Sequence, residues 1–137
     1  MASNVTCTID NFAATLEHIL ADVGHGVDEG VPVVVRKGAQ KARKLTLQNA
    51  REKGWHKGVT NKRYEAGWQY KVKGQGRLVE AEIGNKATPG LPHLLEKGHA
   101  KVGGGRTTAY EHIKPAAEEA FEYTFEEMGK MIDRALR

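Results

Sequence analysis

The stretch from Leu91 to Ala117 constrains the fold more than any other part of the sequence, because glycine and proline divide it at fixed points. Three leucines at helical spacing predict a short helical turn over Leu91–Lys97. Gly98 follows where a positive φ angle commonly ends a helix. The run Gly103–Gly105 predicts a polar loop, and Pro115 predicts the first turn of a closing helix, where its missing N–H costs nothing.

Two amphipathic helices are predicted before this stretch. Apolar residues recur at spacings of three and four between Thr8 and Val23, and Gly24 and Gly26 are expected to end that helix. A second helix is predicted from about Asp28 to Arg51. Its apolar stripe contains Val27, Val31, Val34 or Val35, Gly38, Ala42, Leu45 and Asn49.

A β-hairpin is predicted in the middle of the chain. Residues 54–62 have the composition of a loop, in which Trp55 is either a lid on the core or an interface residue. Apolar and polar residues alternate over 68–73, Gly74–Gly76 reads as the turn, and the return strand is predicted over Leu78–Ile83. In this register opposite charges face each other across the strands: Lys71 and Lys73 against Glu80 and Glu82.

The last predicted element is a helix from Pro115 to about Leu136. Its apolar stripe, expected to form core, contains Ala117, Phe121, Phe125 or Thr124, Met128, Ile132 and Leu136. The elements together predict one α+β domain over residues 1–137. We expect N-terminal helices, a short antiparallel sheet and a C-terminal helix packed on the sheet.

Composition narrows the classes of protein to which the chain can belong. It has 137 residues, enough for one core, but only 39% are hydrophobic and 28% are charged, which predicts a thin core and a large polar surface. No run approaches the roughly 18 apolar residues of a membrane helix. No Lys or Arg precedes Arg36, so a signal peptide is not expected. A single cysteine, Cys7, excludes an internal disulfide and suggests a reducing compartment.

Charge is distributed unevenly along the chain. Residues 1–30 contain five acids and no bases, whereas residues 36–77 contain thirteen Lys and Arg against Glu52 and Glu65. One face of the second predicted helix carries Arg36, Lys37, Lys41, Arg43 and Lys44. Such a chain can bind nucleic acid through its middle or stack on copies of itself through unlike ends.

Two runs resemble a known family. They are Leu94–His99, followed by the basic glycine-rich loop, and His112–Ala116. The pattern resembles the tail-completion, or minor tail component, proteins of long-tailed bacteriophages, which are similar to the lambda-type minor tail protein Z. The resemblance covers nearly the whole chain. It departs at Lys97, where the family more often has an aromatic residue, and at Glu111, where the family has proline or a basic residue.

The resemblance implies a structural role rather than catalysis. It implies a virion protein of the neck or tail end, assembled in the bacterial cytoplasm, that completes the tail and supports head–tail joining. The implied partners are copies of the chain in a ring, six being the simplest number, and tail terminator, tail tube or head–tail connector proteins. Contact with genomic DNA in the channel is a further implied possibility, and no membrane is expected. The motif residues implied to lie at subunit interfaces are Leu94, Leu95, Glu96, Gly98, His99, His112 and Pro115.

The sequence signals for a metal or catalytic site in this stretch are weak. Ligand types suited to zinc occur at His93, Glu96, His99 and His112, but their spacing matches no recognised zinc pattern, and no metal or cofactor is expected. No arrangement typical of nucleophilic or acid–base catalysis is present, so we expect no enzyme. Glu96 lies at the end of a short turn, where a carboxylate opposes the local dipole, so it should have a partner, either a backbone amide or an Arg. The resemblance implies that it fixes the Gly98 loop or contacts a neighbouring subunit.

The alternative function is sequence-independent DNA binding through the basic segment 36–77. The residues that would face DNA in either case are Arg36, Lys37, Lys41, Arg43 and Lys44.

Overall fold

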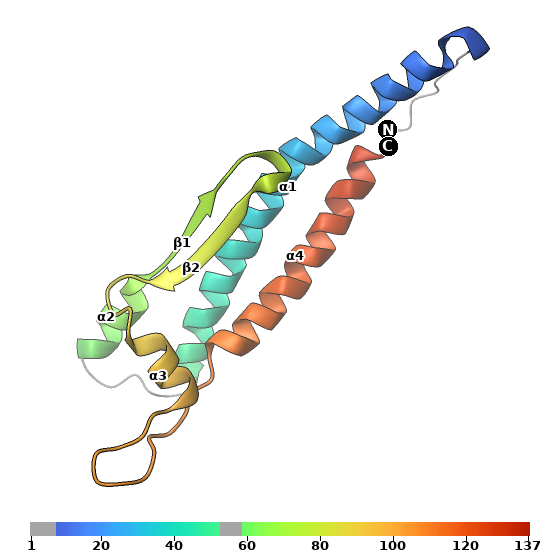
Figure 1. Ribbon diagram of the computed structural model, residues 1–137. Helices are drawn as coiled ribbons and strands as arrows, with labels where there is room; N and C mark the ends of the chain where they lie inside the picture. The colour runs from blue at the N-terminus through green and yellow to red at the C-terminus, as the bar shows by residue number, and fades with distance from the viewer. Residues whose placement is uncertain (1–7, 53–58) are drawn as a thin grey trace.

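The computed structural model describes residues 8–52 and 59–137, and Figure 1 shows the chain as a ribbon. A 3-10 turn at Ile9–Asn11 leads into a long helix. A second 3-10 turn, Gly76–Leu78, lies in the hairpin. The remaining elements, in chain order, are α1 (Phe12–Glu52), α2 (Val59–Gly67), β1 (Trp68–Lys73), β2 (Glu80–Asn85), α3 (Leu91–Lys97) and α4 (Ile113–Ala135). The predicted α+β class is confirmed.

The N-terminal part is one helix of 41 residues, so the predicted break at Gly24 and Gly26 is wrong. Pro32 also lies inside the helix. A glycine in a helix costs about 1 kcal/mol relative to alanine, which weakens a helix without ending it when tertiary contacts compensate. The compensating contacts come from α4: a methyl group at Gly26 would lie 3.3 Å from Ala135 Cβ, and one at Gly38 would collide with Thr124.

Small residues allow α1 and α4 to pack closely side by side. The tightest buried group combines Ala42 and Leu45 of α1 with Ala116 and Ala120 of α4. On α1 the predicted stripe is confirmed at its C-terminal end, where these positions and those around Gly38 are buried. Because the backbones approach so closely, small side chains of α4 fill most of this interface, and the larger Met131 fits only because Gly30 of α1 faces it.

The predicted core stripe of α4 is mostly on the surface, and this prediction was wrong. Phe121 is 70% exposed and Phe125 is 74% exposed, and Ile132 and Leu136 are exposed as well. The buried residues of α4 are instead Ala116, Ala120 and Met131. The apolar residues of α4 do form a stripe, as their spacing predicts. Because α1 and α4 approach closely, however, the neighbouring stripe, which contains Ala116 and Ala120, is the one buried between the helices.

The hairpin has the predicted register. Lys71 pairs with Glu82 and Lys73 with Glu80 in an antiparallel ladder. The return strand begins two residues later than predicted, at Glu80, because Leu78 belongs to the 3-10 turn, where its amide donates to the Gln75 carbonyl at 3.1 Å. Of the predicted loop 54–62, residues 59–62 are helical in α2, while Trp55, like Cys7, lies outside the described residues.

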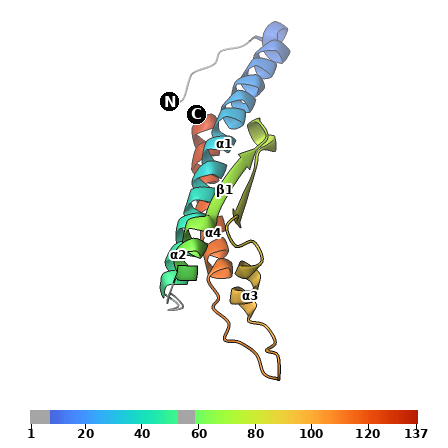
Figure 2. The same ribbon diagram turned by 90° about the vertical axis from the view of Figure 1, so that its left-hand side faces the viewer.

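The hairpin and α4 occupy different sides of α1, as Figures 1 and 2 show. Three polar contacts hold the hairpin on α1. Arg43 Nε donates to the Trp68 carbonyl at 2.8 Å, Gln40 Nε2 donates to the Tyr70 hydroxyl at 3.0 Å, and Arg77 pairs with Asp28 at 2.8 Å. The expectation that the C-terminal helix packs on the sheet was wrong, because α4 packs against α1 and the hairpin packs on another side of α1.

The N-terminal turns of α1 project beyond the end of α4 (Figure 1). We call residues 9–23 the arm. Its apolar residues, which the sequence correctly places in an amphipathic helix, include Phe12 at 57% and Leu20 at 61% exposure. In the described part of the chain, no helix is long and apolar enough to cross a membrane.

Candidate functional site

The helix α3 ends as the sequence predicts. It spans Leu91–Lys97, and Gly98 follows it with φ of 69°. A methyl group at Gly98 would lie 2.6 Å from the Thr107 carbonyl oxygen. Only glycine satisfies both the left-handed backbone and this close approach, so Gly98 fixes the start of the following loop.

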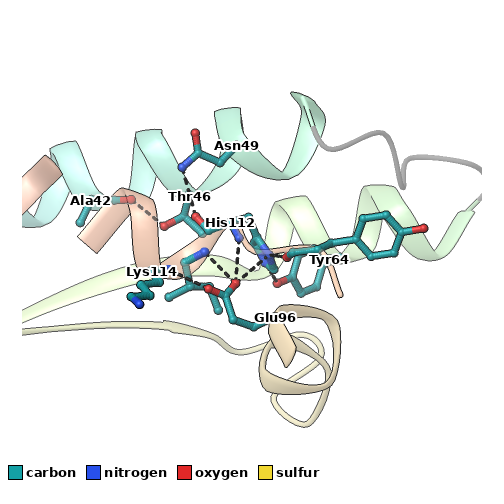
Figure 3. Close-up of polar contacts among 9 residues, drawn as sticks. Ala42, Thr46, Asn49, Tyr64, Glu96, His112 and Lys114 are labelled. Carbon is teal, nitrogen blue, oxygen red and sulfur yellow. Dashed lines mark hydrogen bonds and ion pairs between the residues drawn. The ribbon is translucent and has the colours of Figure 1, made fainter. Parts of the chain in front are cut away.

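Glu96 caps the N-terminus of α4 from another element (Figure 3). Its carboxylate accepts the backbone N–H groups of His112, Ile113 and Lys114, each at 2.8 Å. A helix begins with four N–H groups that lack intrahelical partners, and the fourth position here is Pro115, which has no N–H. One carboxylate and one proline therefore satisfy the whole first turn.

This cap resolves two predictions. Of the alternatives for Glu96, the backbone amide is confirmed. The helix begins at Ile113, two residues before the predicted start, because Glu96 binds the amides that precede Pro115. A carboxylate at this end also interacts favourably with the helix dipole.

His112 lies fully buried beside this cap. Its Nδ1 is 2.6 Å from the Tyr110 carbonyl oxygen and 3.1 Å from Glu96 Oε1, both of which can only accept hydrogen bonds when Glu96 is ionised. Nδ1 must therefore carry the proton. Its Nε2 lies 2.5 Å from the Tyr64 hydroxyl and accepts a hydrogen bond from that group when the ring is neutral.

Further contacts tie this cluster to the rest of the fold. Tyr64, Trp68 and His112 meet edge to face, with ring centroids 5.7 to 6.4 Å apart. Asn85 Nδ2 donates to the Tyr64 carbonyl at 2.7 Å, and its Oδ1 accepts the Thr88 amide at 3.0 Å. We call Tyr64, Trp68, Asn85, Glu96 and His112 the junction, because they join α2, the hairpin, α3 and the start of α4.

Burial and hydrogen bonding set the ionisation of the junction. Burial favours the neutral form of Glu96, but the three backbone amides and the nearby His112 outweigh it, so the pKa of this carboxyl is lowered. Burial is the main cause that raises the pKa of Tyr64 well above its ordinary value, and the Glu96 charge adds to it. Tyr64 and His112 have no solvent exposure, so this network joins elements and is not open to a substrate.

A cavity of about 460 Å³ lies next to the junction, between α1, the hairpin and α4. Its lining residues are Ala42, Thr46, Trp68, Ile83, Gly84, Asn85, Pro89, Pro92, Ile113 and Ala117. None of these side chains titrates near neutral pH. The cavity offers apolar surface and two polar side chains, and no group suited to acid–base or nucleophilic chemistry.

The remaining motif residues separate into exposed and buried positions. Leu94 and His99 are exposed and Leu95 is half-buried, whereas Glu96 and His112 serve inside the chain. The three histidines considered as zinc ligands, His93, His99 and His112, do not form a metal site. Across residues 8–52 and 59–137, no group of three or more His, Cys, Asp or Glu side chains could hold a metal ion.

The five basic residues of the second predicted helix do not act as one face. Arg43 is bound to the Trp68 carbonyl, and Lys41 Nζ lies 5.4 Å from the centre of the Tyr123 ring. Arg36, Lys37 and Lys44 are exposed and make no ion pair within the part of the chain that the structure describes.

Sequence reasoning missed the outer face of α4, which we define as Phe121, Phe125, Ile132 and Leu136. The two phenylalanine rings stack at 6.4 Å with an interplanar angle of 23°. The available signal was the recurrence of small residues at helical spacing, with Gly26, Gly30, Gly38 and Ala42 on α1 and Ala116, Ala120 and Thr124 on α4. In the structure Gly26 lies against Ala135, Gly30 against Met131 and Gly38 against Thr124, while Ala42 packs with Ala116 and Ala120. That pattern favours close packing through the small stripe and leaves the large residues outside.

No protein-family model, no curated protein and no solved structure matches this chain. The resemblance to phage tail-completion proteins therefore stays a prediction from the motif residues.

Proposed function

We propose that this chain is a structural virion protein of a phage neck or tail end, which completes the tail and supports head–tail joining as one subunit of a ring. The phage assignment rests on the resemblance of the two motif runs. The structural role is supported by one observation: two separate elements expose large apolar side chains that the described chain leaves uncovered. These are the outer face of α4 and the arm of α1.

Exposed apolar surface of this kind indicates contact with other protein. The two surfaces differ in shape and belong to different helices, so a neighbour that covers one need not present the same surface in return. Contacts between unlike surfaces build rings when the rotation closes. Six subunits is the simplest number for a ring on a six-fold tail tube.

The motif residues fit this role. Glu96, Gly98, His112 and Pro115 fix the direction in which α4 leaves the junction, and so they fix where its outer face points. A motif that orients a surface suits an assembly protein better than an enzyme. We therefore propose no catalytic activity and no cofactor.

The test is the location and symmetry of the chain in the particle. Image reconstruction of intact particles should show it at the neck or tail end as a ring of six. Antibody or gold labelling of a tagged chain would locate it independently. Labelling elsewhere, or on no particle at all, would end the proposal.

The alternative, sequence-independent DNA binding, is favoured by Arg36, Lys37 and Lys44, which lie exposed on α1 without ion pairs in the described residues. Each phosphate contact contributes about −0.9 to the slope of log affinity against log salt, so these three would give a slope near −3. A DNA-binding protein should show this as a monomer. The ring protein should bind duplex DNA weakly until assembled.

A further inference from the structure

The loop after α3 forms a projecting finger, residues 98–107. Its two sides are joined by a β-bridge between Ala100 and Arg106 and by the Thr107 amide, which donates to the His99 carbonyl at 2.8 Å. The tip turns through three glycines with positive φ, and Val102 at the tip is fully exposed. Figures 1 and 2 both show the finger extending away from the helices of its own chain.

The finger is basic. Lys97 at its base, with Lys101 and Arg106 on it, are exposed, and the sequence has no acid between Glu96 and Glu111. Among the described residues, Arg106 alone of these three makes a polar contact with its charged group, and its guanidinium donates to the Gly98 carbonyl at 3.3 Å. The finger therefore presents positive charge around one exposed apolar side chain.

The first half of α4 presents the opposite pattern. Its exposed acids are Glu118, Glu119, Glu122 and Glu126, and no base occurs between Lys114 and Lys130. The stacked pair Phe121 and Phe125 lies among them, both rings more than two-thirds exposed. This half of α4 therefore presents negative charge around an exposed aromatic pair.

We propose that the finger of one copy docks on the first half of α4 of the next copy. Val102 covers Phe121 and Phe125, while Lys101 and Arg106 lie against the surrounding glutamates. The proposal rests on the ring proposed above and names the two surfaces that would form its joint. The finger and α4 are different surfaces of one chain, so the contact repeats head to tail.

Charge selects this occupant over the arm of a second copy. The arm carries Asp10, Glu17 and Asp22 and has no Lys or Arg, so it would bring like charges to the acidic half of α4. The finger brings opposite charges and a small apolar tip. Like charges across an interface disfavour a wrong partner, and opposite charges favour the matching one.

Cross-linking tests the contact directly. In a full-length chain with Cys7→Ser, the pair Val102→Cys and Glu122→Cys is treated with a short bis-maleimide over a range of protein concentrations. We expect a ladder of covalent dimers and higher species. The matched control, Val102→Cys with Lys44→Cys, places the second thiol among exposed bases of α1 and should give dimers at about one-tenth the yield or less, because like charges would then face each other.

Charge reversal then tests the chemistry of the contact. Glu118→Lys with Glu126→Lys in the cross-linking chain should reduce the dimer yield about tenfold, and adding Lys101→Glu with Arg106→Glu should restore it. Circular dichroism and melting temperature confirm that each variant folds. Equal yields from both cysteine pairs, absent cross-links at the highest concentration, or no rescue by the double reversal would each overturn the docking.

These outcomes separate the docking from the proposed function. A ring in the particle whose fingers do not reach α4 would refute the docking and leave the proposed function standing. A trapped finger–α4 contact in a chain that is not in the particle would refute the function and leave the docking standing.

Discussion

The two faces of α4 differ in a way that divides folding from assembly. The inner face is built mostly of small residues, with Ala116 and Ala120 packed against Ala42 and Leu45 of α1, and Met131 lies against Gly30. The outer face carries the large apolar residues, and Phe121 and Phe125 are mostly exposed. In most single domains the large side chains would face the core. Here close helix approach stabilises the fold, and the larger apolar surface stays exposed, where the proposed ring would cover it.

The largest effect is expected from filling the inner interface. Gly38→Leu would force Thr124 and the helices apart, and overpacking of this kind costs about 3 kcal/mol. Gly129→Leu is the matched control, because a Cβ at Gly129 meets nothing within 4 Å. The control should gain up to about 1 kcal/mol from helix propensity. Urea unfolding of both variants measures the difference, and equal effects would show that the small-residue interface does not determine stability.

Removal of the charge at the junction should have the next largest effect. Glu96→Gln leaves the amides of α4 with a weaker, uncharged acceptor, and we expect a loss of about 2 kcal/mol in the free energy of unfolding. Glu118→Gln, at an exposed acid near the start of the same helix, should change it by less than about 0.5 kcal/mol. Equal free energies of unfolding for the two variants would show that the Glu96 cap does not stabilise the packing of α4 on α1.

The same cap predicts how stability depends on pH. The pKa of Glu96 is lower in the folded chain than its ordinary value of 4.5, so folding favours the ionised form. Its contribution is fully present above that value and is lost as the pH falls through the lower, folded value. Stability of the native chain should therefore fall more steeply below about pH 5 than that of Glu96→Gln. If the free energies of unfolding of the two proteins fall equally steeply with pH below about pH 5, this role of Glu96 is contradicted.

The smallest effect on folding is expected on the outer face. The double variant Phe121→Ser, Phe125→Ser removes two side chains that are mostly exposed in the single chain. The free energy of unfolding should therefore change by less than about 0.5 kcal/mol. The same variant should lose cross-linking and incorporation into particles. A large loss of stability would mean that these rings belong to the core after all.

The sequence predicted local features better than tertiary ones. The helix over Leu91–Lys97, its end at Gly98 and the pairing of Lys71 with Glu82 were correct, because spacing and turn chemistry determine them within a few residues. The break at Gly24 and Gly26 was wrong, because contacts with other elements, Arg77 of the hairpin at Gly24 and Ala135 of α4 at Gly26, compensate for the weak helix formers.

The junction could be predicted only in part. The expectation that Glu96 needs a partner followed from its place at the end of a short turn, and a backbone amide was one of two candidates. That three amides of α4 meet one carboxylate depends on how α3 and α4 pack, which periodicity does not contain. For the same reason, the apolar stripe of α4 was correctly seen as a stripe but assigned to the wrong environment.

The most direct test of the account is a reconstruction of the intact particle that resolves this chain. We expect a closed ring at the neck or tail end, most simply of six copies, in which a neighbour covers the outer face of each α4. A chain present as single copies or as two-fold dimers off the tail axis, or a ring whose α4 outer faces remain in solvent, would contradict it.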